Sequence, residues 1–154
     1  MASQASPSPP AHRVLIAEDD PQGAELLEAY LADTGYEVQT AADGEETLRK
    51  VAAFKPDLIL LDVMMPKISG FEVCKRLRAD PATAATAVLM ITALDQPSDV
   101  ERAVEVKTDD FLTKPINKNE LLLRVRALLE CAKQNPRELD RTLAYIESVE
   151  RGSR

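Results

Sequence analysis

The feature that most constrains this fold is a series of short apolar runs separated by longer amphipathic stretches. Two of the runs, 58–61 and 87–91, are apolar almost throughout, as expected of strands buried on both faces. The stretches between runs repeat apolar residues three and four positions apart, which is typical of helices with one buried face. The alternation predicts an α/β protein with a doubly wound, five-stranded parallel sheet and helices on both faces. The predicted strands are 13–17, 37–41, 58–61, 87–91 and 110–113.

Helix starts are marked by side chains that accept hydrogen bonds from first-turn amides. Asp20 stands directly before Pro21 and is predicted to be a helix N-cap rather than a metal ligand. Capping boxes, in which an N-cap residue and a glutamate three positions later bond each other's amides, mark three further starts. These pairs are Asp43 with Glu46, Ser69 with Glu72, and Asn117 with Glu120.

Length and charge narrow the classes of function. The chain has 154 residues, enough for one domain with a sizeable core. Its 26 acidic and 19 basic residues give a net charge of −7, which disfavours general binding to nucleic acid or to an anionic membrane. The N-terminus lacks the basic start and apolar stretch typical of a signal peptide, no apolar run approaches the roughly 20 residues of a membrane span, and the two cysteines form no metal motif. We therefore expect a soluble, cytoplasmic protein whose partners are proteins or cations.

Acidic residues end two of the predicted strands. Asp62 directly follows the run 58–61, and Glu18 and Asp19 directly follow the run 13–17. Functional groups of a doubly wound sheet gather at the carboxyl ends of its strands, so these three carboxylates are predicted to lie close together and to repel one another. A divalent cation relieves that repulsion, and hard oxygen ligands favour Mg²⁺ or Mn²⁺. Asp62 can also act as a nucleophile toward phosphorus and form an acyl phosphate.

Two more predicted strands end in groups that suit a phosphoryl group. Thr92 and Ala93 follow the run 87–91, and Lys114 with Pro115 follows the run 110–113. The Thr92 hydroxyl can donate a hydrogen bond, and the Lys114 ammonium can pair with anionic oxygens. Together with the acids, they predict a phosphoryl-binding site at one edge of the sheet.

Four segments together resemble the receiver domain of bacterial two-component response regulators. They are "VLIAEDD", "PDLILLDVMMPKISGFE", "VLMITA" and "DDFLTKP", in the family's order and spacing, and the resemblance extends from residue 13 to about residue 132. It implies a flavodoxin-like receiver domain over residues 12–133. It also implies a signalling phosphoprotein that assists its own phosphorylation and dephosphorylation but is otherwise not an enzyme.

The resemblance also implies roles for the acids. Asp62 would accept the phosphoryl group from a histidine kinase or a phosphotransfer protein. Asp19 would bind Mg²⁺ directly, Glu18 would hold it through water, and the Met64 backbone carbonyl would complete the protein's ligands.

The same resemblance implies roles for residues near the ends of the last two predicted strands. Thr92, Ala93 and Lys114 would contact the phosphoryl group, and the peptide bond between Lys114 and Pro115 would be cis. Phe111 would be the aromatic residue that turns inward on activation.

Three alternative functions fit the sequence less well. A phosphatase of the haloacid dehalogenase type needs a second acid two residues after the nucleophile, where this chain has Met64. A flavodoxin-like FMN binder needs phosphate-binding amides after the first strand, where Glu18, Asp19 and Asp20 would repel an anion. A degenerate receiver that acts only as a phosphorylation-independent interaction module is disfavoured by the complete set of acids, threonine and lysine.

Two features bear on signal output and lifetime. Lys107 and Thr108 stand where receivers usually carry Gly-Ala, so we expect either a left-handed lysine at the helix end, strained by about 1 kcal/mol, or a different helix end. Met64 and Leu94 stand two residues after Asp62 and Thr92, in positions that hold or exclude the hydrolytic water in the family. Neither side chain hydrogen-bonds water well, so we expect slow self-dephosphorylation.

The two ends of the chain differ in pattern from the centre. Residues 1–11 are rich in Ser, Pro and Ala and are predicted to be a disordered leader. Residues 134–154 are predicted to form an extra helix, started by Asn135 and Pro136 and carrying a narrow apolar stripe. This helix either packs on its own receiver or mediates a homodimer or binding to a downstream protein. Too few residues follow 132 for a DNA-binding or enzymatic effector domain, so we expect the output to be a protein contact.

Overall fold

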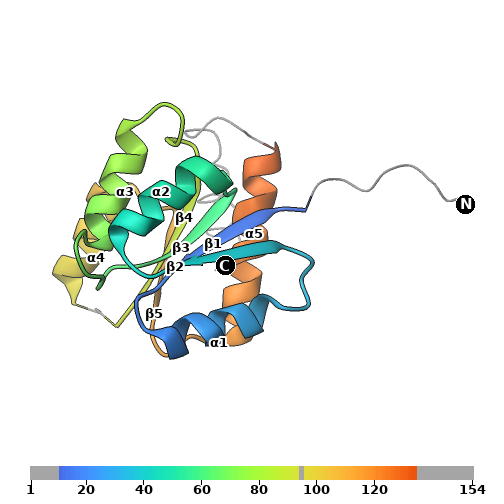
Figure 1. The fold of residues 1–154 in the computed structure, drawn as a ribbon. Coiled ribbons are helices and arrows are strands. Elements are labelled where there is room, and N and C mark those ends of the chain that lie inside the picture. Colours follow the sequence, from blue (N-terminus) through green and yellow to red (C-terminus); the bar gives the residue numbers. More distant parts are fainter. Residues whose placement is uncertain (1–10, 94–95, 135–154) are drawn as a thin grey trace, which may run out of the picture.

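The computed structural model describes residues 11–93 and 96–134, and all five strands in these residues form one parallel sheet (Figure 1). The strand order is β2-β1-β3-β4-β5, so the chain reverses its direction across the sheet between β1 and β3. The predicted doubly wound, five-stranded parallel sheet is confirmed. The strands are β1 (Arg13–Ala17), β2 (Glu37–Ala41), β3 (Leu58–Asp62), β4 (Ala87–Thr92) and β5 (Asp110–Thr113).

Helices cover both faces of the sheet because successive residues of each strand point to opposite sides. Val14 and Ile16 of β1 belong to a core that includes α1 and α5, whereas Leu15 and Ala17 belong to a core that includes α2, α3 and α4. The same division into two sets of helices is visible in Figure 1. The helices are α1 (Pro21–Leu31), α2 (Gly44–Phe54), α3 (Gly70–Ala79), α4 (Pro97–Glu105) and α5 (Lys118–Gln134).

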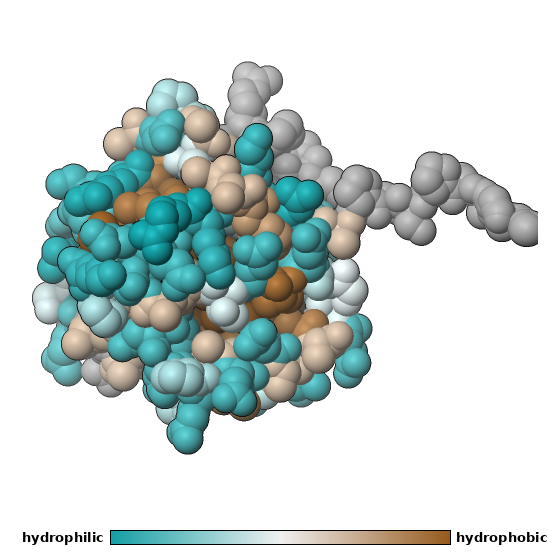
Figure 2. All heavy atoms as spheres, viewed as in Figure 1, coloured by the Kyte–Doolittle hydropathy of each residue, from teal (hydrophilic) through white to brown (hydrophobic). Residues whose placement is uncertain are grey.

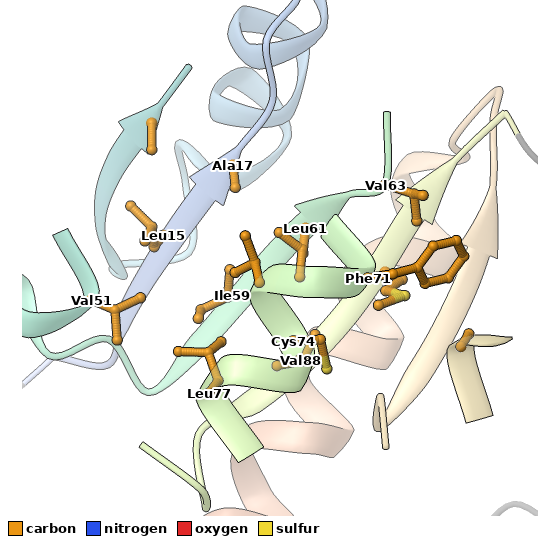
Figure 3. Packing of buried hydrophobic residues seen from close by; sticks show 14 of the residues in the cluster. Leu15, Ala17, Val51, Ile59, Leu61, Val63, Phe71, Cys74, Leu77 and Val88 are labelled. Atoms are coloured by element: carbon orange, nitrogen blue, oxygen red, sulfur yellow. The ribbon is translucent and has the colours of Figure 1, made fainter. Parts of the chain in front are cut away.

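The side chains of the central strands pack closely beneath α3. Leu15, Ile59 and Val88 project from three neighbouring strands into the same cluster as Cys74 and Leu77 of α3 (Figure 3). All five side chains are buried. The face of the molecule seen in Figure 2 is mostly hydrophilic, with smaller hydrophobic areas between the hydrophilic residues. Because the strands are packed on both faces, their carboxyl ends are rigid supports for polar groups.

The predicted N-caps are confirmed. The Asp20 carboxylate accepts a hydrogen bond from the Gln22 amide at 3.3 Å, directly before the first turn of α1. The other caps accept from the amide three residues on: Asp43 from Glu46 at 2.7 Å, Ser69 from Glu72 at 3.3 Å, and Asn117 from Glu120 at 3.0 Å.

The reciprocal half of the predicted capping boxes is wrong. Glu72 bonds Arg76 at 3.0 Å, and Glu120 lies 3.5 Å from Arg124, each one helical turn further on. The Glu46 carboxylate accepts from the Ala42 amide at 2.7 Å, one residue before the cap. An arginine at i+4 competes with the N-cap amide for the glutamate, because a bond between two charged groups is stronger than one to a neutral amide.

The end of α4 settles the choice that the sequence left open at Lys107. This residue is left-handed, with a φ of 63°. Its amide donates to the Val104 carbonyl at 3.0 Å, and the Thr108 amide donates to the Ala103 carbonyl at 3.1 Å. These two bonds form a Schellman motif, which usually has glycine at the left-handed position. The helix therefore ends as in a glycine-capped helix, with a lysine in the strained position.

A buried arginine supports this turn from α3. The Arg78 guanidinium donates to the Asp109 carboxylate at 2.8 Å, to the Lys107 carbonyl at 2.9 Å, and to the carbonyls of Ala84 and Thr86 at 3.1 and 2.6 Å. Only 6% of the Arg78 side chain and 4% of the Asp109 side chain is exposed. Arg78 thus joins the end of α3, the loop before β4 and the turn after α4.

We predict that Arg78→Met lowers the free energy of unfolding by about 3 kcal/mol, because Asp109 would be left buried without its cation. The control is Arg76→Met, which breaks the exposed pair with Glu72 and should change the same quantity by less than about 1 kcal/mol. Urea denaturation of both variants measures the difference. Equal losses in the two variants would contradict the role assigned to Arg78.

Some of the predictions concern residues that the structure does not describe. The predicted leader 1–11 and the predicted helical extension 134–154 lie outside them, apart from Ala11 and from Gln134, which ends α5. Leu94 lies outside them as well. Among residues 11–93 and 96–134, none of the helices is both long and apolar enough to cross a membrane.

Candidate functional site

The three acids predicted to lie together do so at the carboxyl ends of β1 and β3. Ala17 pairs with Leu61 across these strands, which places the next residues, Glu18 and Asp62, side by side. Carboxylate oxygens of Glu18, Asp19 and Asp62 lie within 4.8 Å of one another. Glu18 and Asp62 are each only 3% exposed, whereas Asp19 is exposed. The cluster is therefore built on buried strand ends and is open to solvent on the Asp19 side.

Lys114 reaches this cluster from β5, on the far side of β4. Its ammonium lies 2.6 Å from Glu18 Oε1 and 2.9 Å from Asp62 Oδ2. Its own amide donates to the Thr92 carbonyl at 2.8 Å, and its peptide bond to Pro115 is cis, the isomer that the resemblance implies. One cation thus lies between two buried carboxylates.

The ionisation of the site reflects both burial and pairing. Burial raises the pKa of Glu18 to about 7, the hydrogen bond from Lys114 opposes this rise, and the neighbouring Asp62 adds to it. Burial lowers the pKa of Lys114, but its bonds to the two carboxylates outweigh burial and raise it above its ordinary value. Lys114 therefore remains cationic, and Glu18 gives up its proton less readily than an exposed glutamate.

The donor set fits a divalent cation of the Mg²⁺ type. Three carboxylates offer hard oxygen ligands, and the exposed Asp19 side leaves room for the waters that Mg²⁺ usually keeps. Burial is the main cause of the raised pKa of Glu18 and the neighbouring Asp62 adds to it, and a cation here would favour the ionised carboxylate against both. Glu18, Asp19 and Asp62 are the residues that could hold it.

The backbone after β3 holds Asp62 in a way that the sequence analysis missed. The Met64 amide donates to Asp62 Oδ1 at 3.0 Å, while Asp62 Oδ2 faces Lys114. An aspartate bonding the amide two residues on is an Asx turn, so the signal was present in the sequence. Each oxygen of Asp62 thus has a fixed donor, and the carboxylate has one orientation.

Gly70 sets the shape of the loop that follows. Its amide donates to the Val63 carbonyl at 2.9 Å, which brings the start of α3 back onto the end of β3. A Cβ at this position would collide with the Asp62 carbonyl oxygen and lie 2.8 Å from Val63 Cα. Only glycine allows this close approach, and the loop therefore depends on it.

The remaining predicted residues lie along β4 and β5. Thr92 is fully buried at the end of β4, one residue beyond Ile91, the partner of Asp62 in the sheet. Ala93 follows it and is exposed. Phe111 is half-buried against the core of α2, α3 and α4. The fold thus brings Thr92 and Lys114 to the edge of the sheet that carries the acids. Phe111 lies within β5, three residues before Lys114.

Comparison with known proteins decides the family. The family model of the response regulator receiver domain matches residues 14–126. The chain belongs to this family. Its members are signalling phosphoacceptors rather than classical enzymes, bind Mg²⁺ at an acidic cluster, and interact with histidine kinases or phosphotransfer proteins. In this chain Glu18, Asp19 and Asp62 lie close together at the ends of β1 and β3.

Two curated relatives show how this receiver compares with longer proteins. The chain is 46% identical over 124 residues to the DNA-binding dual master transcriptional regulator RpaA of Synechocystis sp., covering 80% of this chain and 52% of RpaA. It is 47% identical over 116 residues to the response regulator PleD of Caulobacter vibrioides, covering 75% of this chain and 26% of PleD. The chain therefore spans about half of the one relative and a quarter of the other.

Two solved structures are matched by this chain over almost their whole length. The signal receiver domain of a signal transduction histidine kinase from Syntrophus aciditrophicus aligns with a TM-score of 0.76 and 38% identity, covering 81% of this chain and 95% of that one. The chemotaxis protein CheY4 of Vibrio cholerae aligns with a TM-score of 0.72 and 34% identity, covering 76% and 98%. This receiver thus resembles both a domain of a kinase and a chemotaxis protein.

We predict that Gly70→Ala lowers the free energy of unfolding by about 2 kcal/mol and weakens Mg²⁺ binding, because the added Cβ pushes against the backbone of Asp62. The control is Gly35→Ala, at the opposite edge of the sheet. Gly35 has a φ of 83° and open space around it, so its variant should lose about 1 kcal/mol and keep its Mg²⁺ affinity. Urea denaturation and calorimetric Mg²⁺ titration separate the two effects, and unchanged Mg²⁺ affinity in Gly70→Ala would contradict the prediction.

Proposed function

We propose that this receiver is phosphorylated on Asp62 by the phosphohistidine of a histidine kinase or a phosphotransfer protein. The observation that supports this most directly is the Lys114 ammonium, 2.9 Å from Asp62 and 2.6 Å from Glu18. A carboxylate that attacks a phosphoryl group must approach another anion, and fixed positive charge beside it lowers that cost. The orientation of Asp62, with a donor to each oxygen, adds the positioning that transfer requires.

The proposed transfer is a single exchange of bonds at phosphorus. An Asp62 carboxylate oxygen forms the new phosphorus–oxygen bond as the phosphorus–nitrogen bond to the donor imidazole breaks, and the electron pair returns to that nitrogen. Glu18, Asp19, Asp62 and the Met64 carbonyl would hold Mg²⁺ or Mn²⁺, which supplies charge neutralisation for the transferred group when bound. Lys114 would exchange its bond to Glu18 for one to a phosphoryl oxygen.

The switch is proposed to follow from the new oxygens on Asp62. The Thr92 hydroxyl and the Ala93 amide would donate to them, because both residues directly follow the β4 residue that pairs with Asp62. Phe111 would turn further inward, since it is only half-buried on the neighbouring strand. The output would then be a protein contact, made with a partner that binds the rearranged face.

We predict that incubation with acetyl phosphate and Mg²⁺ adds one phosphoryl group to the wild type and none to Asp62→Asn. EDTA should abolish the reaction, because the acids at β1 and β3 would then lack their cation. The control is Asp57→Asn, at the opposite end of β3, where the carboxylate bonds the Arg13 amide at 2.8 Å. This variant should be phosphorylated like the wild type, as intact-mass spectrometry can measure.

Two outcomes would contradict this assignment. Phosphate at the wild-type site in Asp62→Asn would exclude Asp62 as the acceptor, and an unchanged yield with EDTA would exclude the metal. A wild type that takes up no phosphate from acetyl phosphate or from a kinase would instead favour the degenerate, phosphorylation-independent interaction module.

The acyl phosphate is proposed to be long-lived. Met64, two residues after Asp62, is 59% exposed and offers no group that orients a water. The other position with this role, Leu94, lies outside the described residues. We therefore propose slow self-dephosphorylation.

We predict that Met64→Asn shortens the half-life of the acyl phosphate about fivefold, since a hydrogen bond to the attacking water is worth about 1 kcal/mol. Met64→Leu is the matched control and should leave the half-life unchanged, because it keeps an apolar side chain at an exposed position. Loss of the phosphoryl mass over time measures both rates. An unchanged or longer half-life in Met64→Asn would refute the explanation.

A further inference from the structure

Gly23 lies in α1 at a position where the helical backbone does not require a glycine. It is the third residue of that helix, which follows closely after the end of β1 (Figure 1). Among the glycines of the described residues, only Gly35 has the left-handed backbone that favours this residue type. A glycine inside a helix is less favourable than alanine, because its backbone loses more conformational entropy on folding. The advantage of glycine at position 23 therefore comes from what surrounds the helix.

The three nearest atoms that a side chain at Gly23 would meet all belong to Glu18. A Cβ at this position would lie 3.2 Å from Cδ and from Oε1 of Glu18, and 3.3 Å from its Cγ. The optimal distance between two non-bonded carbon atoms is about 3.5–4.0 Å, so a methyl group here would press on the carboxylate. The direction follows from helix geometry, because each Cα–Cβ bond points toward the N-terminal end of its helix, and Glu18 precedes that end of α1.

Hydrogen bonds from two other groups hold the Glu18 carboxylate in place. The Lys114 ammonium donates to Oε1 at 2.6 Å, and the Asp20 amide donates to Oε2 at 3.2 Å. Because Glu18 is buried, its carboxylate has no open space into which it could turn away from a methyl group. A displacement of a few tenths of an ångström would therefore lengthen one of these bonds or change the position of the carboxylate relative to Asp62.

We propose that Gly23 is a positioning residue for the metal site, because its missing side chain leaves room for the Glu18 carboxylate beside Lys114 and Asp62. This inference rests on the proposed function, in which Glu18, Asp19 and Asp62 hold Mg²⁺. Gly23 contacts neither the metal nor the phosphoryl group in this proposal and acts only through Glu18. The helix is less stable with glycine at this position, and the geometry of the acids is kept.

The surroundings of Gly23 make it a better test than Gly70. At Gly70 an added Cβ would collide with the backbone of Asp62, so its replacement changes the loop and the site together. At Gly23 the nearest atoms are the end of one side chain, which can shift without moving the backbone. Gly23→Ala should therefore keep the fold and change the position of the Glu18 carboxylate.

Melting temperatures measured without Mg²⁺ test whether a methyl group at position 23 presses on Glu18. In a Glu18→Ala background the obstructing atoms are absent, and Gly23→Ala should raise the melting temperature by about 2 °C through helix propensity alone. In the otherwise wild-type chain the close contact should cancel this gain and leave the melting temperature unchanged or lower. Equal rises in the two backgrounds would mean that Glu18 does not resist the methyl group, and would overturn the proposal.

Calorimetric titration with Mg²⁺ tests the consequence for the site. Gly23→Ala should weaken Mg²⁺ binding about tenfold, as expected when a group that orients a metal ligand is altered. The matched control is Ala29→Gly, the reverse exchange at an exposed position of α1. It should lower the melting temperature by about 2 °C and keep the wild-type Mg²⁺ affinity. An unchanged affinity in Gly23→Ala, or an equal loss of affinity in Ala29→Gly, would overturn the proposal.

Phosphorylation by acetyl phosphate separates this inference from the function on which it rests. Gly23→Ala should need about tenfold more Mg²⁺ than the wild type for half-maximal phosphorylation of Asp62. An equal Mg²⁺ requirement in the two proteins would overturn the role of Gly23. A wild type that takes up no phosphate would contradict the proposed function instead, and the melting temperatures and Mg²⁺ affinities would still decide the role of Gly23.

Discussion

The mutual repulsion of carboxylates at one edge of the sheet is the constraint on which the site depends. Glu18 and Asp62 are buried side by side at neighbouring strand ends, where their charges are poorly solvated, and Asp19 adds a third. The Lys114 ammonium offsets part of this repulsion from β5, and burial still raises the pKa of Glu18 to about 7. A site with this excess of buried negative charge is suited to binding a cation and, with the cation, to receiving a phosphoryl group.

The rest of the fold holds those charges in place from both ends of the sheet. At the carboxyl edge, Gly70 lets α3 begin directly against the Asp62 carbonyl, which fixes the loop that carries Met64. Toward the amino edge, Arg78 and Asp109 join α3 to the turn before β5, the strand that leads to Lys114. Both supports link α3 to a strand of the site, so packing of this helix and geometry of the site are coupled.

Local sequence patterns predicted the strands well where burial determines the structure. They predicted hydrogen bonds poorly where two donors compete for the same carboxylate. The apolar runs 58–61 and 87–91 were correctly predicted to be strands, because strands buried on both faces need a continuous apolar sequence. Each strand extends one residue further, to Asp62 and to Thr92. The start of α4 was missed because Gln96 is not a typical N-cap residue, although its amide bonds Asp99 at 3.1 Å. Glu72 and Glu120 of the predicted capping boxes face arginines one turn further on, since a charged partner outcompetes a backbone amide, whereas Glu46 accepts from the Ala42 amide rather than from that of its cap.

The sequence by itself determined the alternation of strands and helices, the acid, threonine and lysine at the strand ends, and through them the family. These follow from periodicity and from order along the chain, which are local properties. Only the tertiary structure decided that Lys114 bonds both Glu18 and Asp62, across sequence separations of 96 and 52 residues, and that the pKa of Glu18 rises. It also decided that Lys107 stays left-handed under the Arg78 bond. Such pairings depend on strand order and burial, which place residues together that no sequence spacing connects.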